Sequence, residues 1–283
     1  MEGRDSTKED FMGVGSTPLA WAARGGHKEV VEILLGRDGV NPDKPNSNGK
    51  TPLWYAARNG HEGVVKMLLR RGDINPDKPD TSGRTPLCYA ALNGHERVVK
   101  VLLNQGEVNP NKAGQYGLTP FCAACKNGHE GVVEILLGRS DVDPNIPDNY
   151  YRTPLCWAAW NGHEGIVKML LRRDDINPDG PTYQGLTALW CATGDGHEGV
   201  VKILLGRDDV NPNKAGCFGQ TPLCRAAQNG HEGVVKILLE RDDVDPNKAD
   251  DNGRTPLAYA TGRGHAGIIA LPQPLESTTF SIA

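Results

Sequence analysis

The sequence predicts an all-α solenoid, a stack of eight helix–turn–helix repeats that we number one to eight in chain order. A Thr-Pro-Leu triplet, or a close variant, recurs every 34 residues without slip. A Gly-His pair follows each triplet at a fixed distance, and an apolar stretch follows each pair. An unbroken period of this length is typical of units that bury their apolar faces only against their neighbours. The triplets begin at Thr17, Thr51, Thr85, Thr119, Thr153, Thr187, Thr221 and Thr255.

Residues 46–79 represent the repeat, and their first half predicts a turn followed by a short helix. The turn at 46–50 combines Gly with Asn and Ser, which favour tight turns. Thr51 is expected to cap the helix, with Pro52 in the first position, where a missing N–H costs nothing. Gly60 then ends the helix after about two turns.

The second half of the repeat predicts another helix and a projecting loop. From His61 onward, apolar residues recur at the spacing of one wide helical face. In the first helix, Ala56 and Ala57 supply small side chains that permit close contact between helices. Pro76 keeps the residue before it out of the helical conformation, so we expect an extended segment that leads to the next turn.

This order of turn, helix, helix and loop resembles the ankyrin repeat family, whose signature is T-P-L-H-x-A at a period of about 33 residues. The resemblance covers roughly residues 15–270 and implies an ankyrin-repeat solenoid with projecting β-turn or hairpin fingers. The family's His after Thr-Pro-Leu is replaced here by Ala, Trp or Cys. This change is expected to remove a polar contact to the turn and leave packing to hold that region. One extra residue per repeat is expected to lengthen or bulge the finger.

Composition argues against several kinds of partner. The formal net charge is -4, and no run of five or more Lys and Arg is present, so nucleic acid is not an expected partner. No stretch approaches the roughly 20 apolar residues that a membrane-spanning helix needs. The segment that follows Met1 lacks the apolar core of a signal peptide. We therefore expect a cytoplasmic or nuclear protein, or one found in both compartments, with no membrane partner.

The eight histidines all stand ten residues after a triplet Thr, which predicts a structural role at the start of the second helix. Six of them begin a His-Glu pair, as in the zinc motif H-E-x-x-H. The position of the second zinc ligand is always Val, so neither a metal nor another cofactor is expected. The histidines are His27, His61, His95, His129, His163, His197, His231 and His265.

The seven cysteines are expected to be reduced. Four of them directly follow a triplet, where stacked helices hold equivalent residues about 8–10 Å apart, too far for a disulfide. Cys122 and Cys125 form a C-x-x-C, but no βαβ context accompanies it, so packing is favoured over redox or metal chemistry. The four cysteines that share one position are Cys88, Cys122, Cys156 and Cys224.

These patterns predict a non-enzymatic protein. No Gly-rich loop has the spacing of a phosphate-binding motif, and no His is left over to activate a nucleophile. The resemblance implies a scaffold or adaptor that binds a protein partner through a concave surface of fingers and first helices. Two alternatives stay open: a regulatory repeat region of, or accessory to, a larger multidomain signalling protein, and an accessory enzyme whose site uses non-periodic residues.

Aromatic residues break the repeat pattern in the central turns and are candidate partner-binding residues. Tyr151 replaces the Gly found at this turn position in neighbouring repeats, and Trp160 stands where other repeats have Arg, Leu, Lys or Gln. Exposed aromatic side chains favour an interface, whereas rings that stack between adjacent fingers would stiffen the array instead. The candidates are Tyr116, Tyr150, Tyr151, Trp160, Tyr183, Gln184 and Phe218.

Three segments are expected along the chain. A polar leader covers residues 1–13, and the repeat domain covers residues 14–270. Pro272 and Pro274 are expected to halt the last helix, which leaves a disordered tail at 271–283.

Repeat six is predicted to be the least stable internal repeat. Repeat eight, the last in the array, is also predicted to be less stable than repeats two to five. Ala188 replaces the triplet Pro of repeat six, and Gly194 inside its short first helix costs about 0.5–1 kcal/mol. Hydrogen-exchange mass spectrometry is expected to show faster amide exchange in repeats six and eight than in repeats two to five. Equal protection across these repeats would contradict the prediction.

Overall fold

The computed structural model describes residues 13–180 and 185–271, and this part of the chain contains helices, turns and loops but no strand. The chain forms two compact units, Met1–Ile146 and Pro147–Ala283. The boundary falls at the junction of repeats four and five. Each unit therefore corresponds to four consecutive repeats.

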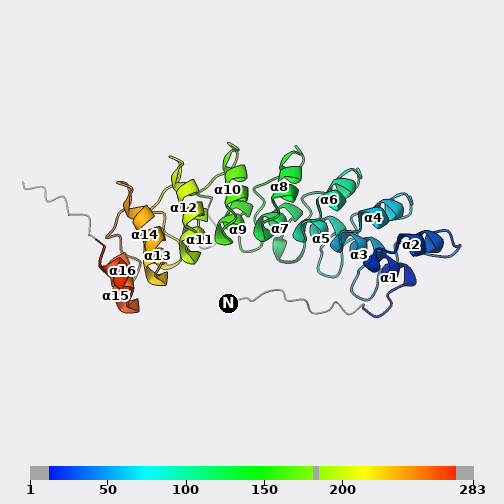
Figure 1. The fold of residues 1–283 in the computed structure, drawn as a ribbon, viewed down its shortest axis with the longest axis horizontal. Helices are drawn as coiled ribbons and strands as arrows, with labels where there is room; N and C mark the ends of the chain where they lie inside the picture. The colour runs from blue at the N-terminus through cyan, green and yellow to red at the C-terminus, as the bar shows by residue number, and fades with distance from the viewer. Residues whose placement is uncertain (1–12, 181–184, 272–283) are drawn as a thin grey trace, which may run out of the picture. The chain divides into compact units, whose positions relative to one another are not determined.

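The predicted pairs of helices are confirmed in all eight repeats (Figure 1). In the first unit the pairs are α1 (Pro18–Gly25) and α2 (Lys28–Leu35), α3 (Pro52–Arg58) and α4 (Glu62–Leu69), α5 (Pro86–Leu92) and α6 (Glu96–Leu103), and α7 (Pro120–Asn127) and α8 (Glu130–Leu137). In the second unit they are α9 (Pro154–Trp160) and α10 (Glu164–Leu171), α11 (Ala188–Asp195) and α12 (Glu198–Leu205), α13 (Pro222–Asn229) and α14 (Glu232–Leu239), and α15 (Pro256–Arg263) and α16 (Ala266–Ile269). Two short 3₁₀ turns complete the elements, η1 (Gln115–Gly117) and η2 (Cys217–Gly219).

Each unit has two rows of helices. The first helices of successive repeats contact one another, as do α1, α3, α5 and α7 in the first unit and α9, α11, α13 and α15 in the second. The second helices form the other row and pack on the first helix of their own repeat. The fingers are turns that precede the first helices, so finger residues and first helices lie next to each other.

A threonine cap starts every first helix, as predicted. The Thr51 hydroxyl accepts a hydrogen bond from the Trp54 backbone N–H at 3.1 Å, and Pro52 is the first helical residue. The same bond measures 3.1–3.2 Å in the other seven repeats. Thr187 keeps its cap although Ala188 replaces the triplet Pro, so the threonine alone is sufficient to start α11.

Small and branched apolar residues fill the space between the rows. Ala56 and Ala57 of α3 are fully buried, which brings neighbouring first helices close together. Val64, Val65 and Leu68 of α4 are also fully buried and form the predicted apolar face. Burial of one such Val or Leu contributes about 1.5–3 kcal/mol, so the core of each repeat depends on the repeats beside it.

In six of the described repeats a histidine joins the repeat to the one before it. The Nε2 of His95 in repeat three donates to the Arg58 carbonyl oxygen at the end of α3, 2.8 Å away. Equivalent bonds in five other repeats measure 2.8–3.1 Å, which confirms the structural role predicted for these histidines. Gly60 has a φ of 76°, and a Cβ there would lie 2.7 Å from His95 Nδ1. Gly60 is therefore required both for its backbone angle and for the space that the next histidine ring occupies.

The two ends of the described chain depart from the regular repeat. Trp21 and Ile33 in repeat one are exposed, whereas the equivalent residues of the other repeats are buried or half-buried. At the other end α16 has four residues where α14 has eight, which agrees with the predicted interruption by proline. The predicted leader at 1–13 and tail at 271–283 lie outside the described residues, apart from one residue of each.

Loss of a joining histidine is predicted to destabilise the fold. In His95→Ala the Arg58 carbonyl loses its donor, so we expect the free energy of unfolding to fall by about 1–3 kcal/mol. His27→Ala is the matched control, because His27 is exposed in repeat one and we expect a change within about 0.5 kcal/mol. Urea unfolding followed by circular dichroism measures both, and equal losses would contradict the assigned role.

Candidate functional site

Most of the described fingers are built on a buried Asp or Asn side chain. In repeat three, Asp80 Oδ1 accepts hydrogen bonds from the backbone N–H groups of Ser82 at 2.9 Å and Arg84 at 3.1 Å. Asp148 and Asp250 make the same pair of bonds in repeats five and eight. The buried carboxylate therefore sets the turn from the inside and leaves the tip residues to face outward.

An aromatic residue on the first helix ties each of these carboxylates to the helix row. Asp80 Oδ2 accepts a hydrogen bond from the Tyr89 hydroxyl at 3.0 Å. Nine residues also separate Asp148 from Trp157, whose Nε1 donates to it at 3.1 Å. These anchors were not among the predicted site residues. The signal that could have found them is the recurrence of an aromatic residue nine positions after Asp or Asn in the same repeats.

The residue after the triplet keeps a polar contact to the turn of the next repeat. Trp54 Nε1 donates to Asp80 Oδ2 at 3.2 Å, and Trp190 Nε1 donates to the Gln220 carbonyl at 3.1 Å. The expectation that packing alone holds this region is therefore wrong for both tryptophans. The indole N–H reaches the next finger because the tryptophan is long enough to span the interval between repeats.

Repeats four and seven carry a different finger. In repeat four Gly114 replaces the buried Asp or Asn, and Ala123 replaces the aromatic anchor. The tip consists of two successive left-handed residues, Tyr116 with φ 63° and Gly117 with φ 75°. Two positive φ angles in sequence define a type I′ turn, which usually requires Gly, Asn or Asp at both positions. Repeat seven repeats this arrangement with Gly216, Phe218, Gly219 and Arg225.

Three aromatic residues occupy left-handed backbone conformations at finger tips. Tyr116, Tyr151 and Phe218 have φ values of 63°, 61° and 57°, and they are the residues other than glycine with positive φ in the described chain. This conformation costs about 1–2 kcal/mol for a bulky side chain. Their side chains are 51%, 55% and 75% exposed, so burial within the chain recovers little of that cost. All three belong to the predicted site.

In repeat five, Arg152 and Trp157 connect two predicted site residues, Tyr150 and Trp160. Arg152 and Trp157 were not among the predicted site residues. The Arg152 guanidinium lies 4.7 Å from the Tyr150 ring centre and 4.0 Å from the Trp157 ring centre. The Trp157 and Trp160 rings lie 6.2 Å apart. A continuous stack thus runs from the finger tip at Tyr150 to the end of α9 at Trp160. Several repeats have a basic residue directly before the triplet, and Arg152 is one of these. This recurrence is the sequence pattern from which Arg152 could have been predicted.

The predicted site residues do not all share one environment. Tyr116 belongs to the first unit, and Tyr150, Tyr151, Trp160 and Phe218 belong to the second. Trp160 is half-buried and its ring lies beside that of Trp157, whereas the interface hypothesis expects an exposed ring at this position. Tyr183 and Gln184 lie outside the described residues.

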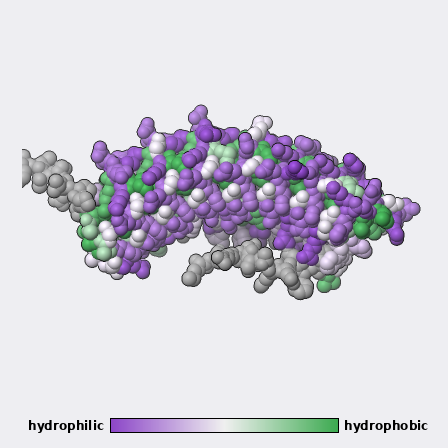
Figure 2. All heavy atoms as spheres, in the orientation of Figure 1, coloured by the Kyte–Doolittle hydropathy of each residue, from purple (hydrophilic) through white to green (hydrophobic). Residues whose placement is uncertain are grey.

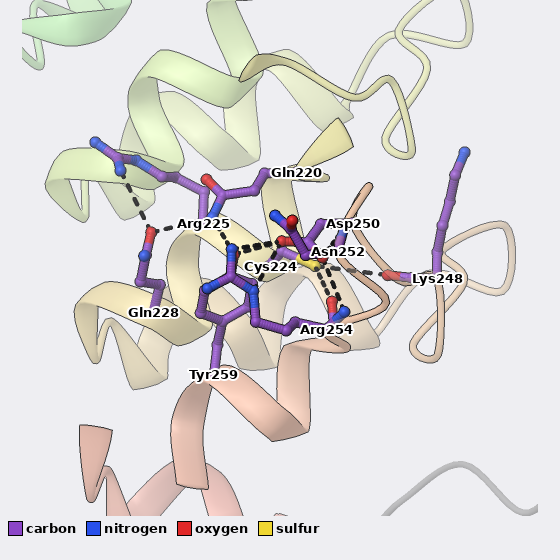
Figure 3. Close-up of polar contacts among 9 residues, drawn as sticks. All are labelled: Gln220, Cys224, Arg225, Gln228, Lys248, Asp250, Asn252, Arg254 and Tyr259. Atoms are coloured by element: carbon purple, nitrogen blue, oxygen red, sulfur yellow. Dashed lines mark hydrogen bonds and ion pairs between the residues drawn. The ribbon is translucent and has the colours of Figure 1, made fainter. Parts of the chain in front are cut away.

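The polar cluster of repeats seven and eight shows how a finger is held (Figure 3). The Tyr259 hydroxyl from α15 donates to Asp250 Oδ2 at 2.6 Å, and Arg254 Nη2 pairs with the same oxygen at 3.1 Å. Burial acts to raise the pKa of Asp250, but hydrogen bonds from Tyr259 and from the backbone N–H groups of Arg254 and Asn252 lower the pKa to about 2. Asp250 is therefore a stable anion that organises this finger.

A substitution in repeat six makes room for an arginine in repeat seven. A Cβ at Gly194 would lie 3.0 Å from Arg225 Nε. The Arg225 guanidinium lies 4.7 Å from the Trp190 ring centre and its Nη1 is 3.5 Å from Gln228 Oε1 (Figure 3). The glycine that weakens α11 thus admits a cation–π contact between the two repeats.

The thiols have the environment of core side chains. Burial raises the pKa of Cys88 to about 12 and also raises the pKa of Cys125, the second residue of the C-x-x-C. The seven cysteines are free, and all except Cys217 are buried. Cys156 of α9 and Cys191 of α11 are in hydrogen-bond contact, although they occupy different positions of the repeat.

Helix pairs joined by repeat-to-repeat hydrogen bonds, each with a finger ahead of its first helix, define a tandem helical-repeat protein. A family model described as ankyrin repeats (3 copies) matches residues 2–80, 72–148, 140–215 and 206–271. The chain belongs to the ankyrin repeat family, whose repeats generally act as protein–protein interaction modules. A comparison with curated proteins finds no match. Among the described residues, none of the helices has the length and apolar character needed to cross a membrane.

Acid is predicted to weaken the second unit through Asp250. Its folded pKa of about 2 lies below the ordinary value of 3.8, so its contribution to stability is present above about pH 4 and is lost as the pH falls toward 2. Asp250→Asn is expected to flatten this part of the stability profile, measured as urea midpoints between pH 5 and pH 2.5. Asp242→Asn is the control, because Asp242 is exposed. A flattened profile in both variants would contradict the assignment.

Proposed function

We propose that the protein is a non-enzymatic interaction scaffold that binds a protein partner through its fingers and first helices. The observation that carries this proposal is the set of exposed, left-handed aromatic tips at Tyr116, Tyr151 and Phe218. Each of these rings keeps more than half of its surface in solvent in the free chain although its backbone conformation is strained. In a complex the same ring can be buried, and Tyr, Trp and Arg are the residues enriched in interface hot spots.

The surface favours recognition by separate anchors over a broad apolar contact. On the face drawn in Figure 2, polar side chains predominate and apolar ones form smaller patches between them. The Tyr150 ring is 56% exposed and lies beside the Arg152 guanidinium, and an aromatic ring with a neighbouring arginine is a composition typical of interface centres.

An enzymatic role has less support. Ankyrin repeat proteins are typically non-enzymatic. The histidines, the usual general bases, donate to backbone carbonyls in the repeats where the contact is described.

The finger variant Tyr116→Asn, Tyr151→Asn and Phe218→Asn is predicted to lose partner binding without losing the fold. Asn tolerates the left-handed conformation, so the melting temperature should stay unchanged or rise. We expect affinity capture from cytosolic and nuclear extracts, quantified by mass spectrometry, to fall at least about tenfold for proteins enriched by the wild type.

Ile33→Asn provides the matched control, because Ile33 is exposed on a second helix away from the fingers. It should leave capture unchanged. Equal capture by the wild type and the finger variant, with intact circular dichroism, would argue against the proposal, and so would equal loss in both variants.

A further inference from the structure

Repeat one exposes side chains at positions that the other repeats bury, and we name Trp21, His27 and Val30 the repeat-one face. Val30 of α2 is 46% exposed, whereas its equivalents in the other repeats are at most 6% exposed. Val31, the next residue, is fully buried. The contacts of α1 and α2 with α3 and α4 bury that other side of the helix pair. The exposed side is therefore the one that inner repeats bury against the repeat before them.

Repeat eight exposes the reciprocal positions, and we name Leu257, Gly264 and Ile269 the repeat-eight face. Leu257 of α15 and Ile269 of α16 are 38% and 41% exposed, whereas their equivalents elsewhere are at most 3% exposed. Ile268, the equivalent of Val30, is buried. The two repeats therefore expose opposite sides of the same kind of contact.

The contact between repeats seven and eight shows how such sides meet. Leu223 and Val235 of repeat seven and Ile268 of repeat eight line the same cavity. Inner repeats thus place two residues of one repeat opposite a third residue of the next. The equivalents of these residues on the exposed faces are, in the same order, Leu257, Ile269 and Val30.

The repeat-eight face also has open space where inner repeats hold a histidine ring. A Cβ at Gly230 would lie 2.7 Å from the His265 ring, as at the equivalent glycines of five other repeats. Gly264 has the same left-handed backbone, with φ 73°, but a Cβ there would meet no atom of the described chain within 4 Å. Beside it, the exposed Gly262 carries the carbonyl equivalent to that of Gln228, which accepts the His265 bond.

The matching histidine lies on the repeat-one face. His27 directly precedes α2, as His265 directly precedes α16. His265 Nε2 donates to the preceding repeat at 3.1 Å, whereas the His27 side chain belongs to an exposed residue. The two faces therefore carry the two halves of the bond that joins inner repeats.

We infer that a second copy of this chain stacks its repeat-one face on the repeat-eight face, so that the row of repeats continues from one copy to the next. In this contact the apolar side chains of the two faces cover each other. The His27 ring lies beside Gly264 and donates to the Gly262 carbonyl. The inference goes beyond the proposed function and does not depend on it, because neither face contains a finger residue.

A second copy fits these faces better than an unrelated apolar partner. Terminal repeats left in solvent carry polar outer faces, so apolar outer faces call for a cover. The cover on repeat eight has to supply a histidine at a fixed place beside apolar side chains, and repeat one has this arrangement. Because the two faces differ, a pair of copies still has one face of each kind, and association continues into open chains or closes into a ring.

Sedimentation velocity of the full 283-residue chain tests the inference. We expect the weight-average mass to rise above that of one chain between about 1 and 100 µM. Val30→Glu and Ile269→Glu should each hold the protein as single chains, because each buries an unpaired carboxylate in the contact. Gly264→Asn should also weaken association, since Asn tolerates the left-handed backbone and fills the space for the His27 ring.

Ser140→Glu is the matched control. It makes the same change of charge at an exposed loop residue of repeat four, away from both faces, and should associate like the wild type. Val30 and Ile269 are themselves exposed, so circular dichroism should show all of these variants folded.

A mixture of the two blocked variants tests the direction of stacking. Val30→Glu keeps its repeat-eight face, and Ile269→Glu keeps its repeat-one face. An equimolar mixture should therefore form a complex of one copy of each variant and grow no further. Contact between two identical faces predicts instead that one of the variants associates by itself.

Three outcomes would overturn the inference. The first is a wild type that stays a single chain at about 100 µM, as it would if residues of its own chain covered either face. The second is association of either blocked variant alone to the same extent as the wild type. The third is a mixture of folded variants that stays as single chains.

Failure here is distinguishable from failure of the proposed function. These measurements use the purified chain and no partner, so a wild type that does not associate leaves the scaffold role untouched. The finger variant Tyr116→Asn, Tyr151→Asn and Phe218→Asn should associate like the wild type even though it is expected to lose partner binding.

Discussion

In six of the described repeats a backbone carbonyl at the end of the first helix accepts a hydrogen bond from a histidine of the next repeat, and the stack depends on this bond. The histidine that donates to this carbonyl is also the residue at which the second helix of its own repeat begins. One side chain therefore links two repeats at the start of the second helix. The glycine before the histidine, as at Gly60, leaves space for the ring of the next histidine. The bond involves the backbone at the end of one first helix and a histidine side chain of the next repeat. It therefore places no constraint on the side chains of the finger or of the exposed face of the first helix. Those positions are therefore able to vary between repeats.

The variable positions change in pairs. Where Asp or Asn supports the turn, as at Asp80, Asp148 and Asp250, an aromatic residue nine positions later donates to it or stacks beside it. Where glycine supports the turn, the anchor is absent and a type I′ tip holds an exposed ring instead. The buried aromatic residue holds the finger, and the type I′ tips display theirs to solvent; the Asp148 finger of repeat five combines the two, because it buries Trp157 and exposes Tyr150 and Tyr151.

The side chain that supports the finger also differs in charge between repeats. A finger aspartate pairs with the neighbouring arginine in repeats five and eight, whereas the finger of repeat two is built on the neutral amide of Asn46. The exchange of a carboxylate for an amide leaves the turn unaltered, because both side chains accept the same backbone hydrogen bonds. In repeat six, Gly194 stands at the position that Arg or Lys occupies in repeats one, two and four. The glycine costs helix stability, but it leaves room for Arg225 to lie against Trp190.

The sequence by itself determined the period, the helix pairs and the caps, because these depend on contacts within a few residues of each other. The threonine cap spans three positions, and the role of the histidines follows from their constant place in the repeat. The sequence also singled out Tyr116, Tyr151 and Phe218 as departures from the period. Only the tertiary structure decided that the Trp54 indole reaches Asp80, 26 residues away, and that the Trp190 indole reaches the Gln220 carbonyl, 30 residues away. Sequence patterns within one repeat miss such contacts, because stacking brings together residues that lie in neighbouring repeats.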